Sequence, residues 1–181
     1  MKNIFLSLLA GTILSSAVAS AANAKTLVTY FTLTGNTEKA AKIIQEKTGG
    51  DLYQIELVTP YPTEYKEQTK LAKEELNSGY LPPIKPLPEN MAEYDVVFVG
   101  SPVWWGTMAT PVRTFLNSGA LSGKTVIPFV THGGGGADNS FSDTAKLCKG
   151  CTVIEDGWSG YSTLTFGLSG WIEKTMEKLN K

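Results

Sequence analysis

The feature that most constrains the fold is a series of short, strongly apolar segments separated by helical patterns or long connections. Val96-Val97-Phe98-Val99 is apolar without alternation, which is typical of a strand in a parallel sheet covered on both faces. Five such segments are predicted as strands: Thr26 to Phe31, Leu52 to Glu56, Asp95 to Gly100, Thr125 to Thr131, and Thr152 to Glu155. The pattern therefore predicts an α/β domain of three layers.

Helices are predicted between these strands from capping residues and apolar spacing. The second helix is predicted to begin at Thr63 as N-cap and to turn Tyr65, Ala72 and Leu76 inward. The others are predicted from Asn36 to Thr48, after Pro111, near Asp143 to Leu147, and at the end of the chain with Ile172, Met176 and Leu179 on one face. One residue conflicts locally with the strand pattern: Pro128 falls inside the fourth predicted strand, although proline is normally confined to an edge or a bulge.

Composition excludes several classes of protein. A net charge of -1 over 181 residues gives no basic field of the kind that holds nucleic acid. Two cysteines are too few for a disulfide-stapled miniprotein. No metal site is predicted.

The first 24 residues are predicted to be a secretory signal rather than part of the fold. Lys2 is followed by the short apolar stretch Ile4 to Leu14, and Ala22-Asn23-Ala24 is a small-x-small cleavage site. The stretch is too short for a membrane anchor, so the mature protein is expected to be exported, to the periplasm, without a membrane span. Residues 25–181 would then form one domain with 15 basic and 17 acidic residues, a net charge of -2.

Three candidate loops each follow a predicted strand, and ligands bind beyond the carboxyl ends of such strands. In the first, Thr32-Leu33-Thr34-Gly35-Asn36-Thr37, hydroxyl and backbone N–H groups at a helix N-terminus would bind an anion without Lys or Arg. The alternative is a tight turn with a threonine cap.

The second loop contains two tryptophans, and the third contains four consecutive glycines. In Ser101-Pro102-Val103-Trp104-Trp105-Gly106, at least one tryptophan is expected to line a cleft that a flat ring could enter, the alternative being two tryptophans in packing roles. In Thr131-His132-Gly133-Gly134-Gly135-Gly136, the glycines would let the backbone approach a ligand, the alternative being a flexible surface loop. His132 is the single histidine, and either proton donation or a plain hydrogen-bonding role is open to it.

These loops resemble those of the flavodoxin family. Thr32, Thr34, Gly35 and Thr37 match every fixed position of its phosphate loop, and the similarity extends over Lys25 to Lys181, most fully from Asp95 to Phe115. The resemblance implies a flavodoxin-like three-layer α/β/α sandwich with a five-stranded parallel sheet in the order 2-1-3-4-5. It also implies non-covalent FMN binding, with phosphate on Thr32 to Thr37 and the flavin ring near Trp104, Trp105, Gly106 and the glycines Gly133, Gly134 and Gly136.

The function that the resemblance implies is electron transfer between redox proteins. The sequence leaves two alternatives open: a flavin-dependent reductase of quinones or nitro compounds with His132 as proton donor, and a binding module that has lost FMN. Cys148 and Cys151 follow a predicted helix rather than open one, so a structural disulfide is favoured over a redox-active pair in an exported protein.

Overall fold

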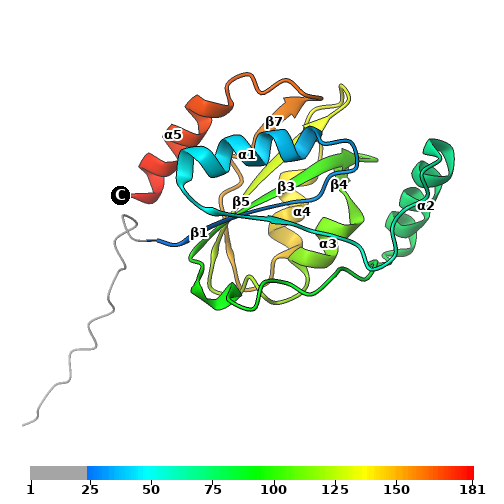
Figure 1. The fold of residues 1–181 in the computed structure, drawn as a ribbon, viewed down its shortest axis with the longest axis horizontal. Coiled ribbons are helices and arrows are strands. Elements are labelled where there is room, and N and C mark those ends of the chain that lie inside the picture. Colours follow the sequence, from blue (N-terminus) through cyan, green and yellow to red (C-terminus); the bar gives the residue numbers. More distant parts are fainter. Residues whose placement is uncertain (1–23) are drawn as a thin grey trace, which may run out of the picture.

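The computed structural model describes residues 24–181, and the predicted signal lies outside the described residues except for Ala24. The helices and strands alternate along most of the chain (Figure 1). The strands are β1 (Thr26–Tyr30), β2 (Asp51–Gln54), β3 (Val96–Trp104), β4 (Thr107–Met108), β5 (Thr125–His132), β6 (Thr152–Val153) and β7 (Trp158–Tyr161). The helices are α1 (Asn36–Thr48), α2 (Tyr65–Ser78), the 3-10 helix η2 (Met91–Glu93), α3 (Thr110–Leu116), α4 (Ser140–Leu147) and α5 (Leu168–Leu179).

The sheet has the predicted order. Its parallel strands run β2-β1-β3-β5-β6, which correspond to the predicted order 2-1-3-4-5. The two-residue strand β4 adds an antiparallel hairpin to the end of β3. The fold is therefore the flavodoxin-like α/β/α sandwich that the sequence predicted.

Strand β3 shows why the apolar run lacked alternation. Val96 and Phe98 are buried in one cluster with residues of α1 and α5, such as Ile44 and Ile172. Val97 and Val99 are buried in the opposite cluster with residues of α3, such as Phe115. Figure 1 shows α1 and α5 on one side of the sheet and α3 and α4 on the other. Both faces of the strand are therefore core.

The edge strand beside β5 is divided into the two short strands β6 and β7, and this division explains how Pro128 fits inside β5. β6 pairs with Thr125 and Val126, while β7 resumes pairing at Phe129. Pro128 faces the gap between these two short strands, so the donor that proline lacks is not needed there. The prediction of one strand from Thr152 to Glu155 was wrong in extent, since only Thr152 and Val153 pair in that stretch and Trp158–Tyr161 was not foreseen.

Helix α2 differs from its prediction. Its N-cap is Glu64 rather than Thr63, because the Glu64 carboxylate accepts hydrogen bonds from the backbone N–H groups of the first turn. Ala72 is buried as predicted, but Leu76 is only half-buried and Tyr65 is exposed. Figure 1 shows α2 at one end of the molecule, near the hairpin of β3 and β4, and Thr110 of α3 donates a hydrogen bond to Glu75 of α2. This placement leaves one face of the helix beside the candidate site.

None of the helices between residues 24 and 181 has the length and apolar character of a transmembrane span.

Candidate functional site

The three predicted loops converge on one cavity of about 300 Å³. It lies where β1, β3 and β5 end, at the position that an open parallel sheet offers to ligands. Predicted site residues that line it are Thr32, Leu33, Thr34, Asn36, Thr37, Pro102, Val103, Trp104, Thr131, His132 and Gly133. No lysine, arginine or carboxylate is among the residues that line it, so any anion there must be held by neutral groups.

The loop between β1 and α1 forms a cradle of backbone donors. Gly35 adopts a left-handed conformation with φ of 84°, and its N–H donates to the Thr32 hydroxyl at 3.0 Å. Within residues 24–181, no hydrogen bond occupies the backbone N–H groups of Asn36 and Thr37, which belong to the first turn of α1. These donors and the helix dipole make the loop suited to a phosphate group.

A pair of buried threonines connects this cradle to the end of β5. The hydroxyl oxygens of Thr37 and Thr131 lie 2.8 Å apart and share a hydrogen bond. Both residues line the cavity although their own exposure is very small. The two strand ends are thus joined at the base of the cavity.

The hairpin of β3 and β4, which carries Trp104 and Trp105, is held to α4 by polar contacts. Thr107 donates a hydrogen bond to Asp143 on α4 at 2.6 Å, and Arg113 lies 3.6 Å from the same carboxylate. Burial works against ionisation of Asp143, but hydrogen bonds from Thr107 and Lys146 and the charges of Lys146 and Arg113 outweigh it, so the pKa of this carboxyl group is lowered. The hairpin is therefore fixed to a charged network at neutral pH.

Trp104 belongs to an aromatic cluster at the wall of the cavity. Its ring packs edge-on against Phe31 and Tyr61, with centroids 5.6 and 5.5 Å away. Behind it, Tyr61 donates to the buried carboxylate of Glu75 at 2.5 Å, and the Thr110 hydroxyl also donates to Glu75. Trp104 therefore serves both of the roles that the sequence left open, packing and lining.

His132 organises the glycine loop. Its Nδ1 accepts hydrogen bonds from the backbone N–H groups of Gly134 at 3.0 Å and Gly136 at 3.2 Å. Both glycines have positive φ, which lets the loop close around the imidazole. With Nδ1 as acceptor, the proton of the neutral ring lies on Nε2. The N–H groups of these two glycines, which the sequence assigned to the flavin, are thus used by the histidine.

Some predicted residues lie outside the cavity wall. Ser101 is fully buried, and its hydroxyl accepts from Ala109 N and donates to Pro102 O. Trp105 lines a neighbouring cavity instead. The glycines Gly35, Gly106, Gly134 and Gly136 shape the turns with positive φ values rather than line the cavity.

Three residues that line the cavity were not predicted. Tyr65 and Gln68 come from α2, and Ser162 follows the unforeseen strand β7. Ser162 could have been found by the strand-end rule had β7 been recognised. The prediction that Tyr65 turns into the core was wrong, because helical spacing alone does not show which way an aromatic side chain faces.

Cys148 and Cys151 are joined by a disulfide, with Cα atoms 5.8 Å apart. The pair lies between the end of α4 and the start of β6, away from the helix N-terminus that would activate a thiol. Residues 24–181 contain no group of three His, Cys, Asp or Glu side chains placed to hold a metal ion.

Comparisons with known proteins agree with this geometry. A family described as flavodoxin matches residues 25–175. A crystal structure of a candidate flavoprotein from Bacteroides eggerthii is 32% identical, covering 88% of this chain and 99% of that one, with a TM-score of 0.72. One from Bacteroides uniformis is 29% identical over 83% and 98% of the two chains, also with a TM-score of 0.72. A flavoprotein from Lactobacillus acidophilus, solved in complex with FMN, is 23% identical over 82% and 98%, with a TM-score of 0.67.

Proposed function

The chain belongs to the flavodoxin family, and on that premise we propose that it binds FMN non-covalently and carries electrons between redox proteins. The observation that supports this most is the cavity at the strand ends, where a neutral phosphate cradle and an aromatic wall lie together. The cradle suits the phosphate of FMN, and the aromatic wall suits its flavin ring. The FMN complex of the Lactobacillus acidophilus protein, which shares this fold, points the same way.

The residues present fit FMN at both ends. The N–H groups of Asn36 and Thr37, with the hydroxyls of the same loop, would hold the phosphate. Pro102, Val103 and Trp104 would lie along one side of the ring, and His132 and Gly133 along another. When bound, FMN supplies one- and two-electron chemistry, while the protein provides orientation and control of the charge around the ring.

A second candidate function is an FMN-dependent reductase of small quinones or nitro compounds. It is favoured by one observation: His132 lines the cavity with its exchangeable proton on Nε2, where it could donate to a bound molecule. In an electron carrier, by contrast, the role of His132 would be limited to its hydrogen bonds with the glycine loop.

Electron transfer from the reduced, FMN-loaded protein separates the two candidates. A carrier should reduce a redox protein isolated from its own compartment at a rate that saturates with the partner, and should reduce small quinones slowly. Fast steady turnover of a small quinone, lost in His132→Ala, with no protein acceptor found, would contradict the carrier function.

We also propose that residues 1–24 direct export to the periplasm. The supporting observations are the signal-like sequence and the Cys148–Cys151 disulfide, which suits an oxidising compartment. Cell fractionation with mass spectrometry should find a mature chain that begins at Lys25 in the periplasm. A chain that retains Met1 to Ala24 in the cytoplasm would contradict export.

A further inference from the structure

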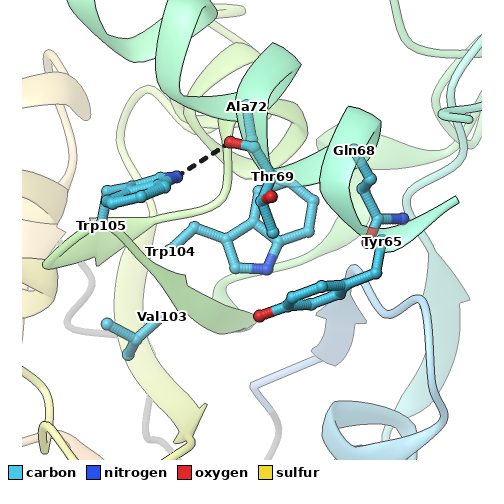
Figure 2. Close-up of a pocket in the computed structure, with 7 residues that line it drawn as sticks. All are labelled: Tyr65, Gln68, Thr69, Ala72, Val103, Trp104 and Trp105. Atoms are coloured by element: carbon cyan, nitrogen blue, oxygen red, sulfur yellow. Dashed lines mark hydrogen bonds between the residues drawn. The ribbon is translucent and has the colours of Figure 1, made fainter.

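A second cavity of about 290 Å³ lies between α2 and the hairpin of β3 and β4 (Figure 2). Tyr65, Trp104 and Trp105 supply its aromatic surface, and Gln68, Thr69 and Ala72 supply much of the rest. Four of its lining residues also line the strand-end cavity that is assigned to FMN, here called the flavin cavity, so the two cavities share a wall: Tyr65, Gln68, Val103 and Trp104. The proposed function leaves this second cavity unused.

The lining restricts what the second cavity can bind. Three aromatic rings favour a planar ligand, and none of the residues that line it carries a charge. The volume is at the lower end of the range for small-molecule sites, roughly 300–1,000 Å³. A planar molecule of about two fused rings suits a cavity of this size and lining.

Hydrogen-bonding groups around the cavity add a second restriction. Among the described residues, the Tyr65 hydroxyl, the Gln68 side-chain amide and the Trp104 indole Nε1–H have no hydrogen-bonding partner, and all three side chains line the cavity. All three can donate a hydrogen bond. Carbonyl oxygens on a planar ligand are the natural acceptors.

Trp105 is held at the rim by contacts that core packing does not explain. It is 56% exposed and adopts a positive φ of 52°, which is unusual for a bulky residue. Its indole Nε1–H donates to the Thr69 carbonyl oxygen at 3.2 Å, as Figure 2 shows, and Lys73 lies 4.5 Å from the ring centroid. An exposed ring kept in a strained backbone position is expected where it contacts a ligand.

We propose that the second cavity binds a planar, uncharged two-ring aromatic molecule with carbonyl oxygens, of the naphthoquinone class. The ligand packs against the aromatic side chains and accepts hydrogen bonds from Tyr65, Gln68 or Trp104. It lies beside the flavin cavity and not in it, so the site goes beyond the FMN binding proposed above.

Menadione is a suitable probe, added to the flavin-free protein and to the protein saturated with FMN. Calorimetry should show saturable binding in both, and the indole N–H signals of Trp104 and Trp105 should shift in ¹⁵N spectra. Thr69→Phe, which fills the cavity without touching the flavin cavity, should weaken menadione binding at least 10-fold and leave FMN affinity within twofold. Trp105→Ala should weaken it similarly, whereas Phe166→Ala, which removes an exposed ring elsewhere, should leave it unchanged.

Three results would overturn this inference. The first is competition between menadione and FMN, which would make the second cavity part of the flavin site. The second is unchanged menadione binding in a folded Thr69→Phe protein, and the third is no menadione binding to the wild-type protein. A failure of FMN binding would be recorded separately by its own titration, and the flavin-free arm of the experiment would still test the second cavity.

Discussion

Replacing Thr37 by valine tests the phosphate cradle most specifically. The substitution keeps the shape of the side chain and removes one hydroxyl, whose oxygen lies 2.8 Å from that of Thr131. Thr131 is only 4% exposed, so losing its partner should lower the free energy of unfolding by about 1–3 kcal/mol. Losing a hydrogen bond to a charged phosphate should cost about 1.5–3 kcal/mol of binding, which is roughly 10- to 150-fold in the dissociation constant.

The assay compares two ligands that differ only in the phosphate. Quenching of flavin fluorescence gives the dissociation constants of FMN and of riboflavin for each protein. Thr37→Val should weaken FMN and leave riboflavin within about twofold, because riboflavin has no group for the cradle to hold. Thr29→Val is the matched control, since Thr29 is also fully buried but its hydroxyl donates to Phe98 O, away from the cavity. Equal weakening of both flavins by Thr37→Val, or no weakening, would refute the placement of the phosphate.

Three further predictions concern stability and potential. Gly100→Ala should lower the free energy of unfolding by about 1–3 kcal/mol in a urea titration, because the new Cβ would lie 2.3 Å from the Phe129 ring; a cost below about 0.5 kcal/mol would contradict this packing. Burial and the hydrogen bond to Glu75 raise the pKa of Tyr61, so the contribution of this residue to stability is full below pH 10 and falls above it by up to about 1.4 kcal/mol per pH unit. In urea titrations between pH 9 and 11, Tyr61→Phe should remove this part of the slope and leave the parts from Tyr30, Tyr53 and Tyr94, whose pKa values are also raised. The net charge of -2 on residues 25–181 predicts a less negative two-electron potential than in strongly acidic flavodoxins, and a redox titration giving an equally low value would contradict it.

The sheet and the three converging loops could be predicted because their signals are local. Val96 to Val99 are apolar at every position, so a strand buried on both faces follows from the sequence alone. The strand-end rule then brings Thr32, Trp104 and His132 together without any knowledge of distances.

What could not be predicted depends on contacts between distant segments. β6 and β7 pair with β5 on either side of Pro128, so the gap between them depends on a contact with another strand. Neither short strand has a strong apolar pattern of its own. From the sequence, Glu75 is expected to be a solvent-exposed charge on a charged helix. It is buried instead, and Tyr61 and Thr110 from other segments donate hydrogen bonds to it. Tyr65 faces the site instead of the core because α2 lies at one end of the molecule, near the hairpin of β3 and β4.

The most direct test of FMN binding is a titration of the flavin-free wild-type protein with FMN, followed by flavin fluorescence and visible absorbance. We expect saturation at one FMN per chain, a shifted flavin spectrum, and weaker binding of riboflavin than of FMN. A protein that leaves the FMN spectrum and fluorescence unchanged at saturating concentrations would contradict the assignment of the strand-end cavity to a flavin.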